Sequence, residues 1–443
     1  MTRWTTNPEI LRQMWLELNP ARLASLPLIL LAVFVLAWFL SDDTAAFLAG
    51  CRWISLAGLL LLPGIWGIRL VVDSLTREIH GRTWELQRMT PLSAWEMTLG
   101  KLVGGPIYAW YAGLLVMPPY LFSIWGLGTF PEGLRDLVNL LLGIIWFHGL
   151  SLVLALVGAR KARAWNAEMP RSLPFYLAGA FGLLLWMVGG PLNAFGGRWL
   201  VWYGIPWEHP GVLTGSLLFF AVCSVVGAYR CMRRELQVAD VPWVWLLFLL
   251  TAMVYAAGMG GAPNEWQPVN GLSGRLILAA SVGILAAYVA MFAEVKDPVE
   301  ERRLFAAAEA GDWRSAAESL PLWVVPVVLM GGICALLTVV PGSEFTITFP
   351  LVVYLFLLRD MGLILLANRV VRPRRADAAA VIWLLLLYVL CPMIAGAMTE
   401  SKTAALLFLP LPLDGGMPQL IGVFLQTAVV AALLAPRLRR HPV

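Results

Sequence analysis

The sequence predicts an all-α polytopic membrane protein with about twelve transmembrane helices, and three observations carry this prediction. The 443-residue chain is 60% hydrophobic and only 13% charged, which leaves too little polar surface for a soluble protein of this size. Apolar runs close to the roughly 20 residues that cross a bilayer as a helix recur from end to end. Basic residues gather between these runs on one side of the membrane.

Twelve spans account for the apolar runs and place both termini on the same side. The predicted ranges are 23–40, 54–72, 102–125, 137–157, 173–189, 211–229, 241–259, 276–293, 323–340, 348–367, 378–394 and 420–435. The positive-inside rule makes the side with the basic clusters cytoplasmic. Of the 32 Lys and Arg residues, Arg359 lies deep within a span, and the opposite face holds only Arg52, Arg135, Arg198, Arg275 and Lys402.

Loop lengths favour two six-helix units in tandem, 1–237 and 238–443. In each half, the connection between the second and third spans is long and cytoplasmic, at 73–101 and 294–321. Two long apolar connections also face the other side at matching positions. Matching lengths at matching positions are typical of a tandem repeat, with the second unit a divergent copy of the first. Coincidence of loop lengths is the alternative.

The N-terminal segment predicts a separate amphipathic helix before the first span. Asn7 can cap it, and Pro8 suits its first position. An apolar stripe at helical spacing follows: Ile10, Leu11, Met14, Trp15 and Leu18. Such a helix would lie along the inner membrane surface, either as a simple anchor or as an elbow that braces the first span.

The first cytoplasmic loop, 73–101, is the most informative segment. Ser93 followed by Glu96 forms a capping box, which predicts the start of the third-span helix. Ahead of it, apolar side chains such as Trp84 and Leu86 stand among charged ones, a mixture that suits docking against another protein. The alternative is a solvated loop that only carries topology charges.

The run Arg77–Leu102 resembles the signature of ABC-2 type transporter permeases. The matching residues are Glu78, Thr83, Glu85, Leu86, Thr90, Pro91, Leu92, Ser93, Glu96, Gly100 and Lys101. His80 departs from the pattern where a second acidic residue is common, and Arg82 separates Gly81 from Thr83. The N-terminal segment is similar to the elbow helix of that family. The second half of the chain resembles it in topology only.

The resemblance implies the membrane subunit of an ATP-driven transporter, expected as an exporter in the bacterial cytoplasmic membrane. The 73–101 loop would then couple to a separate cytoplasmic ATPase, which binds ATP and Mg. Trp84 and Leu86 are the expected anchors of this interface. Its expected polar residues are Glu78, Arg82, Thr83 and Glu85.

The chain is not expected to be an enzyme, nor to bind ATP or a metal itself. A phosphate-binding P-loop needs two glycines and then Lys followed by Ser or Thr. Around Gly100 and Lys101, Trp95 stands at the first glycine position and Leu102 follows the lysine. The five cysteines show no metal-ligand spacing. The net charge of +5 sits at span ends and does not indicate nucleic-acid binding.

Two further sites are candidates in the second unit. In the 294–321 loop, the segments 302–308 and 313–317 are predicted helical, and Arg303 and Trp313 would belong to a second coupling element; a solvated linker is the alternative. Arg359 and Asp360 lie midway along the tenth predicted span, where charges are costly. They are either a polar spot on a translocation path or a structural pair between spans.

Two other classes of function stay open. One is a polytopic membrane enzyme acting on lipid-linked substrates, and the other is an ion-coupled secondary transporter. The number of chains is open as well, because one chain, a homodimer or a second permease subunit could complete the pathway through the bilayer.

Overall fold

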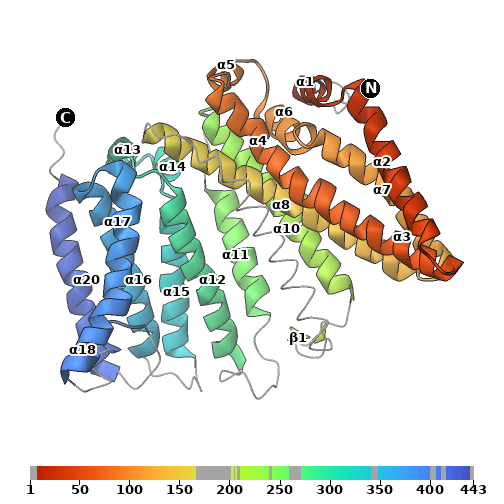
Figure 1. Cartoon of the computed structure of the whole chain (residues 1–443). Helices are drawn as coiled ribbons and strands as arrows, with labels where there is room; N and C mark the ends of the chain where they lie inside the picture. The colour runs from red at the N-terminus through yellow and green to blue at the C-terminus, as the bar shows by residue number, and fades with distance from the viewer. Residues whose placement is uncertain are drawn as a thin grey trace. The chain divides into compact units, whose positions relative to one another are not determined.

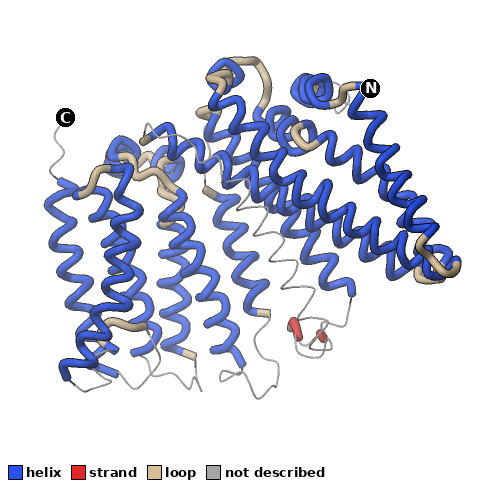
Figure 2. The backbone as a smooth tube through the Cα atoms, in the orientation of Figure 1, coloured by secondary structure: helices blue, strands red, loops and turns tan. Residues whose placement is uncertain are grey.

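A computed structural model describes residues 7–165, 201–203, 205–206, 210–238, 242–258, 271–340, 348–399, 406–410 and 416–439. In this part the chain is an α-helical polytopic membrane protein (Figures 1 and 2). Nine of its described helical segments are long and apolar enough to cross a membrane. Two shorter apolar helices, Trp243–Ala257 and Val324–Val339, accompany them.

The described helices coincide with the predicted spans except at one position. The predicted span 173–189 lies outside the described residues, as do both chain ends. The largest difference is in length: the predicted span 54–72 belongs to a continuous helical segment, Thr44–His80, that extends beyond the apolar run at both ends. The total of twelve spans and the side of the termini therefore stay predictions.

The chain divides into two compact units: unit 1 ends at Asp240, and unit 2 comprises Val241–Val443 together with Ala164–Ala167 and Leu200–Pro206. Unit 1 contains α1 (Pro8–Glu17), α2 (Pro20–Phe39), α3 (Thr44–Leu59), the π-helix η1 (Leu60–Trp66), α4 (Gly67–His80), α5 (Trp84–Arg88), α6 (Ala94–Leu99), the π-helix η2 (Gly100–Gly104), α7 (Ile107–Gly126), α8 (Phe130–Ala164) and α10 (Pro210–Glu235). That the units are repeats stays a prediction.

Unit 2 contains a short antiparallel pair, β1 (Val201–Trp202) and β2 (Ile205–Pro206), in which Val201 pairs with Pro206. Its helices are α11 (Trp243–Ala257), α12 (Gly271–Ala293), α13 (Pro298–Glu309), α14 (Trp313–Glu318), α15 (Val324–Val339), α16 (Thr348–Val370), α17 (Pro373–Leu385), the π-helix η3 (Leu386–Leu390), α18 (Cys391–Thr399) and α20 (Gly416–Arg439). In this unit α16 packs along α20, and α12 packs against α11 and α15.

A proline explains the irregular turn in the second span of unit 1. Pro63 lies inside η1 and has no N–H to donate, so the regular helical ladder cannot run through it. The wider π-turn absorbs this break and joins α3 to α4. His148 of α8 contacts the Pro63 carbonyl oxygen through its Nε2 atom at 2.8 Å, and Gly67 leaves the space for its ring. The span therefore stays continuous into the 73–101 loop.

The core of unit 1 closest to this loop joins five helices. Val72 and Leu75 of α4 pack there with Leu152 of α8 and Met232 of α10. Trp84 of α5 belongs to the same cluster. These side chains are buried together, and their van der Waals contacts stabilise this end of the unit.

Candidate coupling site

The 73–101 loop folds into the end of α4, the short helix α5 and the helix α6. α4 ends at His80, and Arg82 adopts a left-handed backbone conformation with φ 56°. Thr83 then donates its backbone N–H to the Glu78 carbonyl at 3.0 Å, which closes the helix end. α6 begins at the Ser93–Glu96 capping box, whose two reciprocal hydrogen bonds are both present, as predicted.

Trp84 is not the exposed anchor that the sequence predicted. Its side chain is only 2% exposed and packs inside the core of unit 1, next to Met97 and Val72. The Lys101 ammonium lies 5.9 Å from the centre of its ring. α5 is short and carries two apolar residues, Trp84 and Leu86, so its sequence does not say which of them faces the helix bundle. The larger side chain, Trp84, faces inward, where its burial removes more apolar surface from water.

Glu78 is also buried and does not belong to an exposed rim. Its carboxylate pairs with the ammonium of Lys101, whose side chain is fully buried, and with the Arg12 guanidinium of α1. Glu9 completes the group at 3.2 Å from Lys101 and 2.7 Å from Arg12. Two carboxylates thus face two cations, so the charges balance. We call Glu9, Arg12, Glu78 and Lys101 the buried ionic cluster.

The buried ionic cluster changes the protonation equilibria of α1. Burial of Glu9 disfavours its ionised form, but hydrogen bonds from Arg12 and Gln13 and the charge of Lys101 outweigh this, so the pKa of Glu9 lies below its usual value. The hydrogen bond to Glu9, together with the charges of Glu9 and Glu78, raises the pKa of Arg12. Both groups are therefore charged at neutral pH. Removal of one partner would leave an uncompensated buried charge.

The N-terminal helix α1 is seated directly on the start of the third span. Asn7 caps α1, as predicted, and its side-chain amide also donates to the Glu96 carbonyl at 3.0 Å. Gly100 and Gly104 permit the close approach, because a Cβ atom at Gly100 would lie 2.0 Å from the Glu9 Cγ. The polar side of α1 therefore packs on the protein. Most of its apolar stripe is exposed, including Trp15 at 86%.

The outer surface of α5 carries the other predicted interface residues. Arg82, Thr83, Glu85 and Leu86 are exposed, and Leu86 is 62% exposed. Met89, which belongs to the same segment, is exposed beside them. Apolar atoms are thus surrounded by charged ones on a short segment outside the predicted spans. Such a surface suits a protein partner.

Ion pairs hold α5 to the neighbouring helix ends. Arg88 donates from Nε to the Glu235 carbonyl at the end of α10 at 2.9 Å, and from Nη1 to Glu85 at 2.8 Å. Arg163 of α8 pairs with the Glu235 carboxylate and approaches Glu85 at 3.8 Å. The exposed surface of α5 is therefore fixed to three helices of unit 1 (α8, α10 and, through Trp84, α4).

The second loop has the predicted local structure but a different environment. α13 and α14 cover the two predicted helical segments, and the break falls at Gly311, with φ 72°, and at Asp312, which caps α14. Hydrogen bonds from Ser315 lower the pKa of Asp312. Arg303 and Trp313 are both exposed, Trp313 at 74%. Trp313 is thus accessible, in contrast to Trp84.

Arg359 and Asp360 are fully buried within unit 2 and pair with each other. Arg359 donates from Nε and Nη2 to Asp360 Oδ1 at 2.9 and 2.8 Å, and from Nη1 to Gln426 at 2.6 Å. Tyr288 and Tyr388 donate to Asp360 Oδ2 at 2.5 and 2.6 Å. Each carboxylate oxygen therefore has two donors. This geometry favours the structural alternative, a pair that links α12, η3, α16 and α20.

Among the described residues, no group of three or more His, Cys, Asp or Glu side chains is arranged to hold a metal ion. The chain matches no protein-family model, no curated protein and no solved structure.

Proposed function

We propose that this chain is the membrane-spanning permease subunit of an ABC-2 type ATP-driven transporter. In this proposal it has twelve spans with cytoplasmic termini and works as an exporter in a bacterial cytoplasmic membrane. A separate cytoplasmic ATPase binds ATP and Mg and drives it through the 73–101 loop. The proposal rests on the resemblance of Arg77–Leu102 to the family signature.

One structural observation supports this proposal most: the loop is held firmly against the core of unit 1 and exposes apolar side chains on its outer surface. The exposed Leu86 lies on α5 and the exposed Met89 is its C-cap residue, while Trp84 of the same short helix packs into the core. A loop that transmits motion to the spans needs such a rigid attachment, because a partner that pushes on a loosely held loop would move only the loop. The buried ionic cluster links this loop to α1 and to the third span.

Leu86 and Met89 replace Trp84 as the proposed anchors of the ATPase interface. They are the most exposed of the large apolar side chains in the 73–101 loop, ahead of Trp95. Arg82, Thr83 and Glu85 form the polar surroundings, while Glu78 acts from inside by holding Lys101. In this arrangement the docking residues and the bracing residues are different sets.

Affinity purification in mild detergent tests this proposal. The tagged full-length chain is expressed in its own host, and the proteins that co-purify are identified. We expect a P-loop ATPase at a fixed ratio, and we expect Leu86→Asp to lose it. An exposed anchor contributes on the order of 2 kcal/mol or more, which is at least a tenfold change in affinity.

Phe305→Asp is the matched control, because Phe305 is 60% exposed on the loop of unit 2. Retention of the ATPase by this variant would assign docking to the first loop alone, and its loss would add the second loop to the interface. Equal ATPase recovery from wild type and Leu86→Asp would contradict the proposed interface. If no P-loop ATPase is recovered with any form of the chain, the proposed class is wrong.

A further inference from the structure

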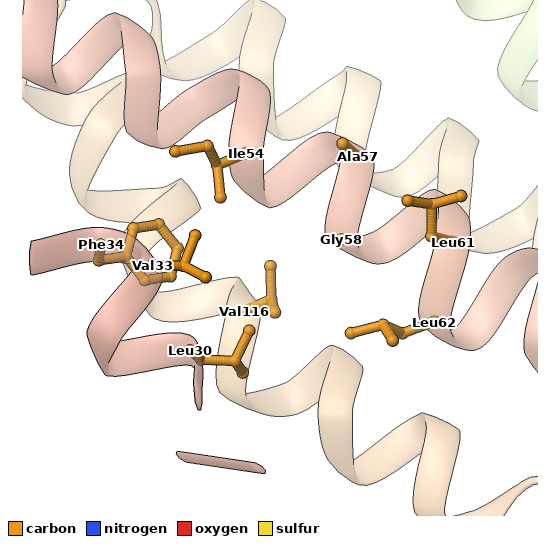
Figure 3. A pocket seen from close by; sticks show the side chains of 9 residues that line it. All are labelled: Leu30, Val33, Phe34, Ile54, Ala57, Gly58, Leu61, Leu62 and Val116. Atoms are coloured by element: carbon orange, nitrogen blue, oxygen red, sulfur yellow. The ribbon is translucent and has the colours of Figure 1, made fainter. Parts of the chain in front are cut away.

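A wholly apolar cavity of about 320 Å³ lies between α2, α3, η1 and α7 of unit 1 (Figure 3). Its walls include Leu30, Val33 and Phe34 from α2, Gly58 from α3, Leu61 from η1 and Val116 from α7. The volume is at the lower end of the range for ligand sites in proteins. A polar ligand would find no hydrogen-bond partner on these walls.

The cavity opens to the surface of unit 1 within membrane-spanning segments. Val33 and Leu61 on its rim are exposed, at 39% and 54%. α2 packs loosely, since Leu26 is its only buried residue. Because α2 is a candidate membrane span, the medium outside this opening is hydrocarbon. The cavity is therefore accessible from the bilayer.

A belt of aromatic and basic side chains lies at one end of the same helices. Arg22 of α2 lies over the Tyr108 ring of α7 at 5.7 Å, and Trp66 of η1 meets that ring edge-on at 5.6 Å. Tyr108 and Tyr111 donate to the carbonyls of Arg22 and Leu23. Trp, Tyr and Arg in this arrangement are typical of the headgroup level of a membrane.

The cavity lies a short way along the same helical segments from the belt. Leu30 is eight residues from Arg22 and Val116 is eight residues from Tyr108, whereas Leu62 is only four residues from Trp66. Eight residues of an α-helix rise about 12 Å along the axis. One leaflet of hydrocarbon is about 15 Å thick. A lipid whose headgroup lies at the belt thus brings its acyl chain to the depth of the cavity.

Basic side chains outnumber acidic ones near the belt. Glu17 of α1 is shared by Arg22 at 2.8 Å and Arg77 at 3.2 Å, and both arginine side chains are about half exposed. Each guanidinium has further donors for an external anion. The apolar wall and the excess positive charge at its end match the two parts of an anionic lipid.

We propose that this cavity holds an acyl chain of an anionic phospholipid from the leaflet on the side of α1, with Arg22 and Arg77 at its headgroup. The lipid fills the gap beside α2 and stabilises its position against α3 and α7. This site is separate from the α5 surface and does not depend on the proposed transport function.

Native mass spectrometry of the full-length chain in mild detergent tests the site. The purified chain is titrated with phosphatidylglycerol and, separately, with phosphatidylcholine. We expect one retained phosphatidylglycerol and weaker retention of phosphatidylcholine. Ala57→Phe places a ring at the cavity and should reduce the retained lipid at least tenfold. Arg22→Gln or Arg77→Gln should weaken phosphatidylglycerol binding roughly fivefold and leave phosphatidylcholine unchanged.

Ala46→Phe is the control, because Ala46 is also an exposed alanine of α3 but does not line the cavity. It should bind lipid like wild type. Equal retention by Ala57→Phe and Ala46→Phe would overturn the site, and so would equal affinity of the wild type for the two lipids. If Ala57→Phe misfolds on size-exclusion chromatography, Leu30→Trp on α2 makes the same test. A lipid-free dimer that Ala57→Phe dissociates would assign the cavity to a second copy instead.

Discussion

The two long loops of this chain share a predicted role but differ in what holds them. In unit 1, Trp84 is buried and the loop stands on the buried ionic cluster. In unit 2, Trp313 is 74% exposed, and the loop is held by Lys296 with Asp377 at 3.1 Å and by Arg369 with Glu301. A backbone N–H bond from Leu322 to Glu294 closes its far end.

Under the proposed function, this difference favours the first loop as the one that transmits force to the spans. A force on the loop reaches a span only through contacts that stay intact under load. Buried ion pairs are the hardest contacts to break, because separating the two charges costs several kcal/mol. The first loop has such contacts with α1 and with the third span, whereas Glu301 of the second loop and Asp377 of α17, the partner of Lys296, are partly exposed. We expect coupling to depend on the first loop.

The largest expected effect is that of Lys101→Met. It leaves Glu78 and Glu9 to share Arg12 as their only cation, and breaking a buried pair in this way costs about 3–5 kcal/mol. The thermal unfolding midpoint in detergent should fall clearly. Lys296→Met in unit 2 is the control and should have a smaller effect, because Asp377 can be hydrated. Equal losses from both variants would remove the distinction between the loops.

Trp84→Ala should follow closely, with a loss of about 3–5 kcal/mol from the cavity left in the core. Trp313→Ala should change stability by no more than about 0.5 kcal/mol, because its ring is exposed. Thermal unfolding of the two variants under the same conditions makes the comparison. A stable Trp84→Ala protein that loses only its ATPase would restore Trp84 as a docking residue.

The dependence of stability on pH sharpens the role of α1. The folded-state pKa of Glu9 lies below the unfolded value of 4.5, so its ionised form stabilises the folded state above pH 4.5. This contribution is lost as the pH falls through the lowered folded-state pKa. The stability difference between wild type and Glu9→Gln should therefore be full at neutral pH and shrink in acid. A difference that stays constant down to that pH range would show that Glu9 acts through packing alone.

The smallest expected effects come from exposed ion pairs on both loops. Glu85→Gln on α5 and Glu318→Gln on α14 should each change the free energy of unfolding by about 1 kcal/mol or less, since their basic partners compete with water. Unfolding curves of the two variants in guanidinium chloride should nearly coincide with the curve of the wild type. A loss above 2 kcal/mol for Glu85→Gln would mean that its contact with Arg163 braces the loop more than its exposure indicates.

Local signals in the sequence predicted local structure well. The Ser93–Glu96 capping box, the Asn7 cap and the two helices of the second loop are all present. Each depends on residues within a few positions of one another, where backbone hydrogen bonding decides the outcome. The expected exposure of Trp84 and Glu78 was wrong, because both side chains are buried. Their burial depends on contacts with α1, α8 and α10, which are distant in the sequence.

Lys101 and Glu9 show what signal was available for the buried ionic cluster. A lysine at the start of an apolar span needs a carboxylate partner, because an unpaired buried ammonium is too costly. Glu78 is in the same loop, but Glu9 and Arg12 lie in a helix that the sequence assigned to the membrane surface. Helical spacing gives the polar side of α1, and it does not give what this side contacts.

By itself, the sequence determined that this chain is a multi-pass helical membrane protein and where the capped helices α1 and α6 begin, because apolar length and cap residues act locally. Only the tertiary structure decided which side chains of the 73–101 loop support it and which are offered to a partner. The physical reason is that a side chain becomes buried through neighbours brought together by folding, and these neighbours come from four separate helices of unit 1.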